Sequence, residues 1–156
     1  MNATIRPAGA KDAATVADVH NRSRAETFRG HIPDAVLNDH GPLEREWAEY
    51  FQRPGGRVYL AEVDGRPVGM AYGIPGGEHG ERTELRNLYL LSEAAGSGIA
   101  PRLMDAVVHP GEPAFLWVAE FNERAQAFYR KHGYRFDGEE THHAGDGITL
   151  KRMVRD

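Results

Sequence analysis

The spacing of apolar residues changes along the chain, and each change marks a different kind of predicted element. Two early segments, 11–25 and 43–53, carry apolar residues near helical spacing, and this spacing returns after position 100. Short apolar or alternating runs that end at glycine or proline predict strands. The predicted strands cover 4–7, 58–63, 67–73, 83–91, 115–118, 134–137 and 148–154, and the later helices cover 101–109 and 123–132.

The order of these elements predicts how the strands pair. Asp64-Gly65 forms a hairpin turn, so the strands beside it run antiparallel, and 83–91 adds a third antiparallel strand. The run 115–118 is almost wholly apolar, as expected of a strand covered on both faces, and a helix separates it from 83–91. We therefore expect these two strands to be parallel and adjacent. The last two strands form a hairpin across 145–147, which completes a single α/β domain over 1–156 with a mixed sheet.

Composition excludes several classes of protein. The chain has 156 residues, of which 40% are hydrophobic and 27% charged, as in an ordinary globular domain. Nineteen Lys and Arg against twenty-three Asp and Glu give a net charge of −4, so we expect no nucleic-acid partner. The absence of cysteine excludes disulfides, thiolate zinc sites and a cysteine nucleophile. No apolar run reaches membrane-spanning length and the first residues lack a secretion signal, so we expect a cytoplasmic protein without a membrane partner.

The eight histidines predict no metal site. None shows a ligand spacing such as His-Glu-x-x-His, and neighbouring strand residues at 142 and 143 point to opposite faces. The histidines are His20, His31, His40, His79, His109, His132, His142 and His143.

A glycine-containing loop lies between the strand 83–91 and an amphipathic helix. Gly96 and Gly98 let the backbone approach a ligand closely, and Pro101 suits a first helical turn. The first N–H groups of a helix have no partner within it, so a diphosphate can accept their hydrogen bonds. A flexible turn that only lets the helix pack on the sheet is the alternative. The loop lacks the third glycine of a Rossmann fingerprint, the lysine of a P-loop and the spacing of a serine-hydrolase elbow.

The loop and a second segment together resemble the GNAT superfamily of N-acetyltransferases. The family's acetyl-CoA loop reads Arg/Gln-x-x-Gly-x-Gly/Ala, and residues 95–100 fit it except that Ala95 stands where Arg or Gln is usual. Residues 115–136 resemble the second motif, with a strand, Asn122 opening a helix, a Phe-Tyr pair ending in Tyr129, and Gly133 followed by an aromatic residue. The resemblance covers essentially the whole chain and is closest to bacterial small-molecule members.

The resemblance implies a fold, a cofactor and a reaction. The fold is a single-domain GNAT fold, whose mixed, mostly antiparallel sheet splays between the parallel strands 83–91 and 115–118, with helices on both faces. Acetyl-CoA would lie in the gap as cosubstrate. The reaction would be direct transfer of acetyl to a primary amine of a small molecule or peptide. A non-catalytic acyl-CoA sensor or interaction module on the same fold, and a nucleotide-binding regulator, remain alternatives.

The resemblance also assigns catalytic roles. Glu84 lies eleven residues before Ala95, the spacing of the catalytic glutamate in one branch of the family, although a glutamate on a wet strand face would look the same. Where other members place a glutamate on the next strand this chain has Trp117, with Glu120 a weaker substitute. The backbone N–H of Leu90 would polarise the carbonyl. Tyr129 would protonate the leaving thiolate, unless it is only a core aromatic.

The residues that the resemblance places against the cofactor come from the strand, the loop and the second motif. They are Leu88, Tyr89, Leu90, Ala95, Gly96, Ser97, Gly98, Ile99, Ala100, Pro101, Asn122 and Tyr129. For Asn122, an N-cap role alone would explain the residue. The acceptor pocket could be lined by His20, Arg24, Trp47, Tyr50 and Tyr72, with core packing favoured for Trp47. The sequence leaves the oligomeric state open, with a homodimer, in which the final strand could pair across the interface, as one option.

Overall fold

The computed structural model describes residues 2–76, 82–143 and 146–156, in which the predicted elements are present in the predicted order. No helix in these ranges is both long enough and apolar enough to cross a lipid bilayer. Short 3-10 turns lie at Ala10–Asp12 and Ser92–Ala94. The helices are α1 (Ala13–Phe28), α2 (Asp34–Leu37), α3 (Gly41–Tyr50), α4 (Ile99–Val107) and α5 (Glu123–Lys131). The strands are β1 (Ala3–Pro7), β2 (Arg57–Val63), β3 (Arg66–Ile74), β4 (Thr83–Leu90), β5 (Ala114–Ala119), β6 (Arg135–His142) and β7 (Thr149–Arg155).

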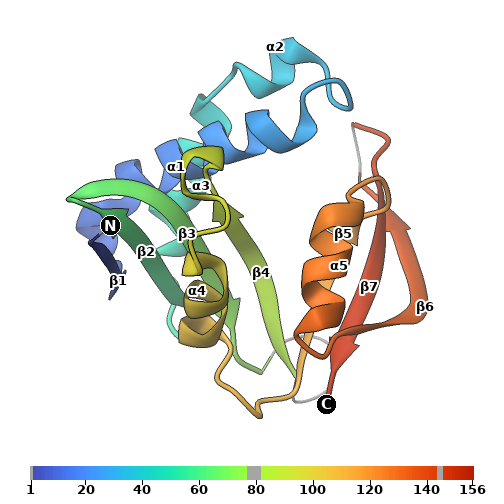
Figure 1. Ribbon diagram of the computed structural model, residues 1–156. Helices are drawn as coiled ribbons and strands as arrows, with labels where there is room; N and C mark the ends of the chain where they lie inside the picture. Colours follow the sequence, from blue (N-terminus) through green and yellow to red (C-terminus); the bar gives the residue numbers. More distant parts are fainter. Residues whose placement is uncertain (1, 77–81, 144–145) are drawn as a thin grey trace.

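The strands form one seven-stranded sheet in the order β1-β2-β3-β4-β5-β7-β6 (Figure 1). β4 and β5 are parallel, and the other neighbouring strands are antiparallel. The parallel pair has two residue pairings, Thr83 with Ala114 and Glu84 with Phe115. β4 continues to Leu90 along β3, so the sheet splays beyond Glu84. The predicted mixed, splayed sheet is confirmed.

Helices cover both faces of the half-sheet β1–β4. On one face α4 packs Leu103, Met104 and Val107 into the larger apolar cluster. On the other face, α1 and α3 bury a second cluster around Val16 and Trp47. At Gly73 on β3, a Cβ would overlap the main chain of Val107, so this glycine allows α4 to lie close to the sheet. Two cores thus hold β4 from both sides and fix its free edge.

The structure corrects several predicted boundaries. α1 ends at Phe28 rather than at 25, α3 ends at Tyr50 rather than at 53, and β6 runs to His142 rather than ending at 137. A bulge between Phe136 and Glu140 interrupts the alternation of β6, and most of its residues are exposed, so its apolar pattern ends early. Gly145, part of the predicted closing turn, lies outside the described residues.

The predicted use of the final strand in a dimer is wrong. β7 lies between β5 and β6 and pairs with both, so neither of its edges is available to another chain. β6 forms that end of the sheet instead. The homodimer itself remains a prediction.

Candidate active site

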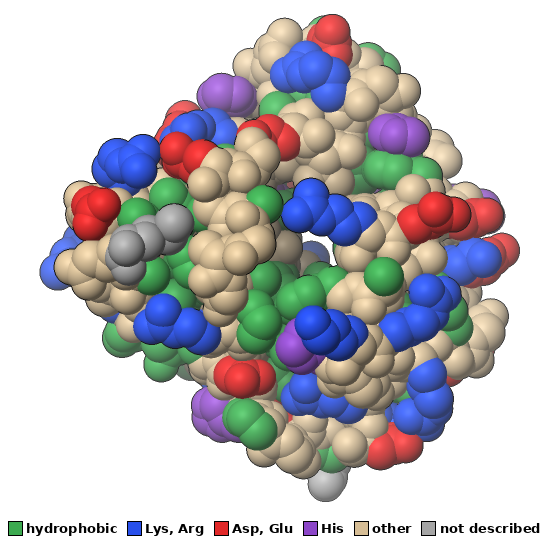
Figure 2. All heavy atoms as spheres, viewed as in Figure 1, with side chains coloured by type: hydrophobic (Ala, Val, Ile, Leu, Met, Phe, Trp, Pro, Cys, Tyr) green, Lys and Arg blue, Asp and Glu red, His purple; other side chains and the backbone are tan. Residues whose placement is uncertain are grey.

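A cleft of about 1470 Å³ opens where β4 and β5 diverge. Its walls come from α1 and α3 on one side, from β4 and the loop 95–101, and from β5, α5 and the β6–β7 connection on the other. Figure 2 shows this face hollowed near its centre, with Lys and Arg side chains at the rim of the hollow. Most of the residues predicted to bind the cofactor line this cleft, namely Leu88, Tyr89, Leu90, Ala95, Gly96, Gly98, Ala100, Pro101, Asn122 and Tyr129.

A bulge in β4 turns two main-chain donors toward the cleft. The N–H of Thr83 donates to the Pro113 carbonyl on the β5 side, whereas the N–H of Leu91 donates to the Val68 carbonyl on the β3 side. Along a regular strand, successive N–H groups point to alternate sides, so those of Thr83 and Leu91, eight residues apart, should point to the same side. They point to opposite sides, so the alternation must shift by one residue between them. The register shift opposite Tyr72 and Gly73 supplies that step. The N–H groups of Leu88 and Leu90 therefore face the gap, and Leu88 lies nearer to Glu84.

The glycine loop presents a row of open backbone donors. Gly96 and Gly98 have φ angles of 75° and 80°, and a Cβ at either position would meet nothing within 4 Å. The glycines are therefore required by backbone conformation rather than by lack of space. Within the described residues, no backbone acceptor bonds the N–H groups of residues 96 to 100. These donors at the start of α4 fit a diphosphate.

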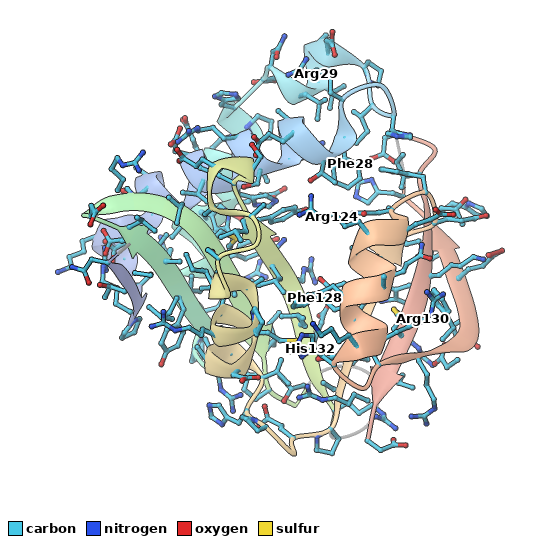
Figure 3. The ribbon with its side chains drawn as sticks, viewed as in Figure 1. Phe28, Arg29, Arg124, Phe128, Arg130 and His132 are labelled. Atoms are coloured by element: carbon cyan, nitrogen blue, oxygen red, sulfur yellow. The ribbon has the colours of Figure 1, made fainter. Side chains whose placement is uncertain are left out.

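Two of the predicted loop residues act differently from the others. Ile99 is fully buried in the core, and the hydroxyl of Ser97 donates to the carbonyl of Ala94. Neither residue is part of the cleft lining, so only their N–H groups are placed to contact a ligand there. Arg24 and Arg124 do line the cleft, and no ion pair occupies either guanidinium within the described residues. Figure 3 shows Arg124 extending from the first turn of α5.

On α5, Asn122 and Tyr129 lie where the second motif predicted them. The side chain of Asn122 accepts a hydrogen bond of 3.1 Å from the N–H of Ala125, which confirms its role as N-cap. Tyr129 is half-buried, with its ring 5.7 Å from that of Tyr134, and it lines the cleft. Burial, with the neighbouring Tyr89 and Tyr134, raises the pKa of Tyr129 above its ordinary value. The residue therefore carries its phenolic proton at neutral pH.

Glu84 lies at the apex of the divergent strands. It is in the last residue pair that β4 makes with β5, and its side chain is 17% exposed and lines the cleft. Its Oε1 is 3.5 Å from Nη1 of Arg86. Trp117 also lines the cleft, but Glu120 is exposed and is not part of the lining. Glu84 is thus better placed than Glu120 to act on a bound substrate.

Of the residues predicted to form the acceptor pocket, some line the cleft and others are buried in the core. His20, Arg24 and Tyr50 line the cleft. Trp47 and Tyr72 are buried at 0% and 5% exposure in the core beneath them, as favoured for Trp47 but not for Tyr72.

His20 links this core to the cleft. Trp47 Nε1 donates to His20 Nδ1 over 3.0 Å, and the His20 ring stacks on Tyr89 with 4.8 Å between centroids. Burial, and to a lesser degree Arg24, lower the pKa of His20 to about 4. The imidazole is therefore neutral at pH 7. Because Nδ1 accepts from Trp47, its proton is on Nε2.

Sequence reasoning missed an apolar cluster at the outer end of the cleft. Phe28 at the end of α1 meets Phe121 edge to face with 5.5 Å between ring centroids, and His31 stacks on Phe121 at 3.6 Å. Ile32 and Ile148 pack into the same cluster. Figure 3 shows Phe28 under α1, facing the cleft. These residues come from loops and helix ends far apart in sequence, and no motif marks them.

The part of the chain that the structure describes contains no group of three His, Asp or Glu side chains arranged to hold a metal ion. His79 lies outside the described residues.

Comparisons with known proteins agree with this geometry. Residues 21–134 match the model of the acetyltransferase (GNAT) family. A probable N-acetyltransferase of Mycobacterium tuberculosis is 29% identical over 143 residues, which span 88% of this chain and 82% of that protein. An uncharacterized N-acetyltransferase of the same species is 33% identical over 147 residues, spanning 83% of this chain and 93% of the relative.

Solved structures share the fold. The PaiA N-acetyltransferase from Thermoplasma acidophilum, solved in complex with coenzyme A, superposes with a TM-score of 0.71 at 20% identity over 97% of this chain and 98% of its own. An acetyltransferase from Thermus thermophilus gives a TM-score of 0.74 at 22% identity over 99% and 97%. The predicted fold is thereby confirmed.

Proposed function

Because this chain belongs to the GNAT family of acetyltransferases, we propose that it transfers acetyl from acetyl-CoA directly to the primary amine of a small molecule or peptide. Family membership identifies an enzyme of the acyltransferase class that uses acetyl-CoA. The acceptor and the direct route are the proposed part. The observation that carries them is that the open N–H groups of the loop, the N–H groups of Leu88 and Leu90, Glu84 and Tyr129 all border one cleft.

The residues that would hold acetyl-CoA are mainly main-chain donors. The N–H groups of residues 96 to 100 would bind the diphosphate, helped by the dipole of α4. The free edge of β4 at Leu88 and Leu90 would pair with the pantetheine arm as an added strand does. Ala95 contributes no polar side chain. Within the described residues, three arginines line the cleft, Arg24, Arg86 and Arg124, and of these Arg24 and Arg124 would contact the phosphates.

The chemistry requires a neutral amine, a polarised carbonyl and a protonated leaving group. An alkylammonium has a pKa of roughly 10, so little free amine exists at neutral pH and Glu84 would accept its proton, directly or through a water. Acetyl-CoA supplies, when bound, the thioester carbonyl that the amine nitrogen attacks. A C–N bond forms and the C–S bond breaks. The N–H of Leu90, the predicted donor, or that of Leu88 would stabilise the developing negative charge on oxygen.

Tyr129 completes the proton balance. As the thiolate leaves, the phenol would donate its proton to sulfur, and solvent would return a proton to the phenol after release. The raised pKa of Tyr129 keeps this proton in place between turnovers. The chain has no cysteine, which fits transfer without an acyl-cysteine intermediate.

A CoA-dependent thiol-release assay over a panel of amines tests the proposal. We expect release with at least one primary amine, and Tyr129→Phe should lower kcat about 100-fold while leaving CoA affinity near that of the wild type. Tyr134→Phe is the matched control, because Tyr134 is an adjacent buried tyrosine whose hydroxyl has no hydrogen-bond partner in the described chain. Glu84→Gln should also reduce kcat, with Glu120→Gln as its exposed control.

A non-catalytic acyl-CoA sensor is the second candidate, favoured by Ala95 in the loop and by the contact of Arg86 with Glu84. It would be supported if CoA bound in calorimetry but no amine released thiol. Equal loss of kcat and of CoA affinity in Tyr129→Phe would remove the acid role.

A further inference from the structure

Glu84 and Arg86, two residues apart on β4, place charges of both signs on one face of the strand, and the β4 bulge adds Asn87 to that face. Leu85 and Leu88 both pack into the core on the α4 side, although residues three apart on a regular strand point to opposite faces. The bulge accounts for this, and it leaves Arg86 and Asn87 together on the other face. Glu84 and Tyr89 share that face, since Tyr89 packs against the core of α1 and α3. All four residues line the cleft.

The ion pair on this face is loose and partly open. Arg86 Nη1 lies 3.5 Å from Glu84 Oε1, beyond the distance of a strong charge-assisted hydrogen bond, and the Arg86 side chain is 47% exposed. Tyr50 also accepts a hydrogen bond from the guanidinium, and Tyr72 lies near it. A guanidinium has five N–H donors, so Arg86 keeps donors for a further acceptor.

The surroundings of the pair are apolar on two sides. The Tyr50 side chain of α3 lies beside Arg86, and Leu43 of the same helix also borders the cleft. Phe115 on β5 and Ile74 on β3 pair with Glu84, and both line the cleft. A ligand held at Glu84 and Arg86 would therefore place the rest of its structure against aromatic and aliphatic side chains. Phe28, Phe121 and Ile148 lie further away, at the outer end of the cleft.

We infer that the acceptor is a zwitterionic α-amino acid with an apolar or aromatic side chain, whose ammonium group meets Glu84 and whose carboxylate meets Arg86. An α-amino acid carries its opposite charges one carbon apart, which matches two opposite side-chain charges already in contact. Binding exchanges one loose intramolecular ion pair for two intermolecular ones, so neither Glu84 nor Arg86 is left without a partner. The inference rests on the proposed function, because Glu84 is also the group that takes the amine proton.

Acetyl transfer would change the contact of the acceptor with Glu84 but not its contact with Arg86. The ammonium loses one proton to Glu84 before attack and a second to solvent as the amide forms, so the N-acetyl product has no cation for Glu84. Its carboxylate still meets Arg86. Arg86 is thus a specificity residue, and its loss should affect acceptors that carry a carboxylate more than those that do not.

Matched acceptors test this on the intact chain by thiol release from acetyl-CoA. The probes are L-phenylalanine, phenethylamine, which lacks the carboxylate, and L-phenylalanine methyl ester, which masks it, together with the corresponding leucine series. We expect kcat/KM to be about 10-fold or more higher for the amino acids than for the amines and esters. Arg86→Gln should lower kcat/KM for the amino acids about 10-fold or more relative to its effect on the amines, so that the preference for amino acids is lost.

Arg53→Gln is the matched control. The Arg53 guanidinium lies over the Tyr50 ring at 5.3 Å from its centroid but is not part of the cleft lining. It should preserve the preference for amino acids. Tm and CoA affinity of each variant are measured alongside, to confirm that Arg86→Gln retains the fold and the cofactor site.

The outcomes separate the inference from the function on which it rests. If amines and esters are acetylated as well as the amino acids, or if Arg86→Gln lowers both kinds of acceptor equally, the amino-acid inference is overturned and the transferase proposal stands. If no acceptor releases thiol although CoA binds, the proposed transfer fails and the inference fails with it. A preference for amino acids that Arg86→Gln abolishes and Arg53→Gln keeps supports both.

Discussion

The loop 95–101 and the acceptor-side face of β4 border the same cleft, but the first is built from main chain and the second from side chains. In the loop, the N–H groups of residues 96 to 100 are the donors, and Gly96 and Gly98 are set by their positive φ angles. On β4, Glu84 and Arg86 supply the polar groups, with Tyr50 beside them. A main-chain site tolerates side-chain change, as at Ala95, and suits a cosubstrate of fixed structure. A side-chain site can be specific to this chain, and suits the acceptor.

The largest expected effect is a dependence of stability on pH. It comes from the side-chain wall of the cleft, which contains the buried His20, whereas the N–H donors of the loop do not titrate. Burial and Arg24 lower the pKa of His20 from 6.5 to about 4. As pH falls below 6.5 the unfolded chain binds a proton that the folded chain refuses, so stability decreases with falling pH down to about 4. The shift corresponds to roughly 3 kcal/mol of unfolding free energy. Urea denaturation at a series of pH values measures it.

His20→Gln should flatten that decrease while keeping an acceptor for the Trp47 N–H. The control is His40→Gln, which removes an exposed histidine and should leave the wild-type slope. The assignment would be refuted if His20→Gln and wild type lost the same free energy between pH 6.5 and 4.

The second prediction concerns the loop. Gly98 caps α4 at φ 80°, a conformation that a β-branched residue adopts only with strain. In Gly98→Val the chain should relax away from it and turn the neighbouring N–H groups out of line. We expect CoA affinity to fall about 10-fold or more, the equivalent of one lost charge-assisted hydrogen bond, as measured by calorimetry.

Gly55→Val separates this effect from general strain. Gly55 has φ 93° and open space around it, like Gly98, but lies outside the cleft lining. It should lose comparable stability and bind CoA as the wild type does. Equal CoA affinity in the two variants would argue against a diphosphate site at the loop.

The same difference explains how much could be predicted from the sequence. The loop, the helix after it and the Asn122 cap were predictable, because glycine, proline and capping residues act on their immediate neighbours in the chain, although α4 begins at Ile99 rather than at 101. The parallel pairing of β4 with β5 followed from one helix between two apolar runs. Each of these features needs only local chemistry or connection order.

The acceptor wall could not be predicted in the same way. Alternation alone places Glu84 and Arg86 on one face, but nothing in residues 83–90 marks a bulge at Arg86, so the addition of Asn87 and Tyr89 to that face follows only from the pairing with β3. Helical spacing placed Trp47 and Tyr50 together, but tertiary packing decided that Trp47 is core and Tyr50 lines the cleft. The contact of Phe28 with Phe121 joins distant segments.

A smaller effect is expected at Asn122, where a local role and a cleft role coincide. Its side chain caps α5 through the N–H of Ala125, so Asn122→Ala should lower the unfolding free energy by about 1 kcal/mol. Asn122→Asp keeps the cap and should restore most of that stability. If CoA affinity falls in both variants, the amide contacts the cosubstrate as well. If stability does not change in Asn122→Ala, the cap contributes nothing.

The smallest effect is expected at Ala95, where the loop departs from the family pattern. Ala95 lines the cleft outside any helix, so a longer polar side chain there has room and no helix to disturb. Ala95→Gln should raise CoA affinity about 3-fold, the gain of one solvent-exposed hydrogen bond, and leave Tm within error. Dephospho-CoA should show the same gain if the new contact is to the diphosphate rather than to the 3′-phosphate. A gain in kcat/KM for amino acids with no change in CoA affinity would contradict the division of the cleft into a main-chain site for CoA and a side-chain site for the acceptor. Ala95, in the main-chain site, would then be acting on the acceptor.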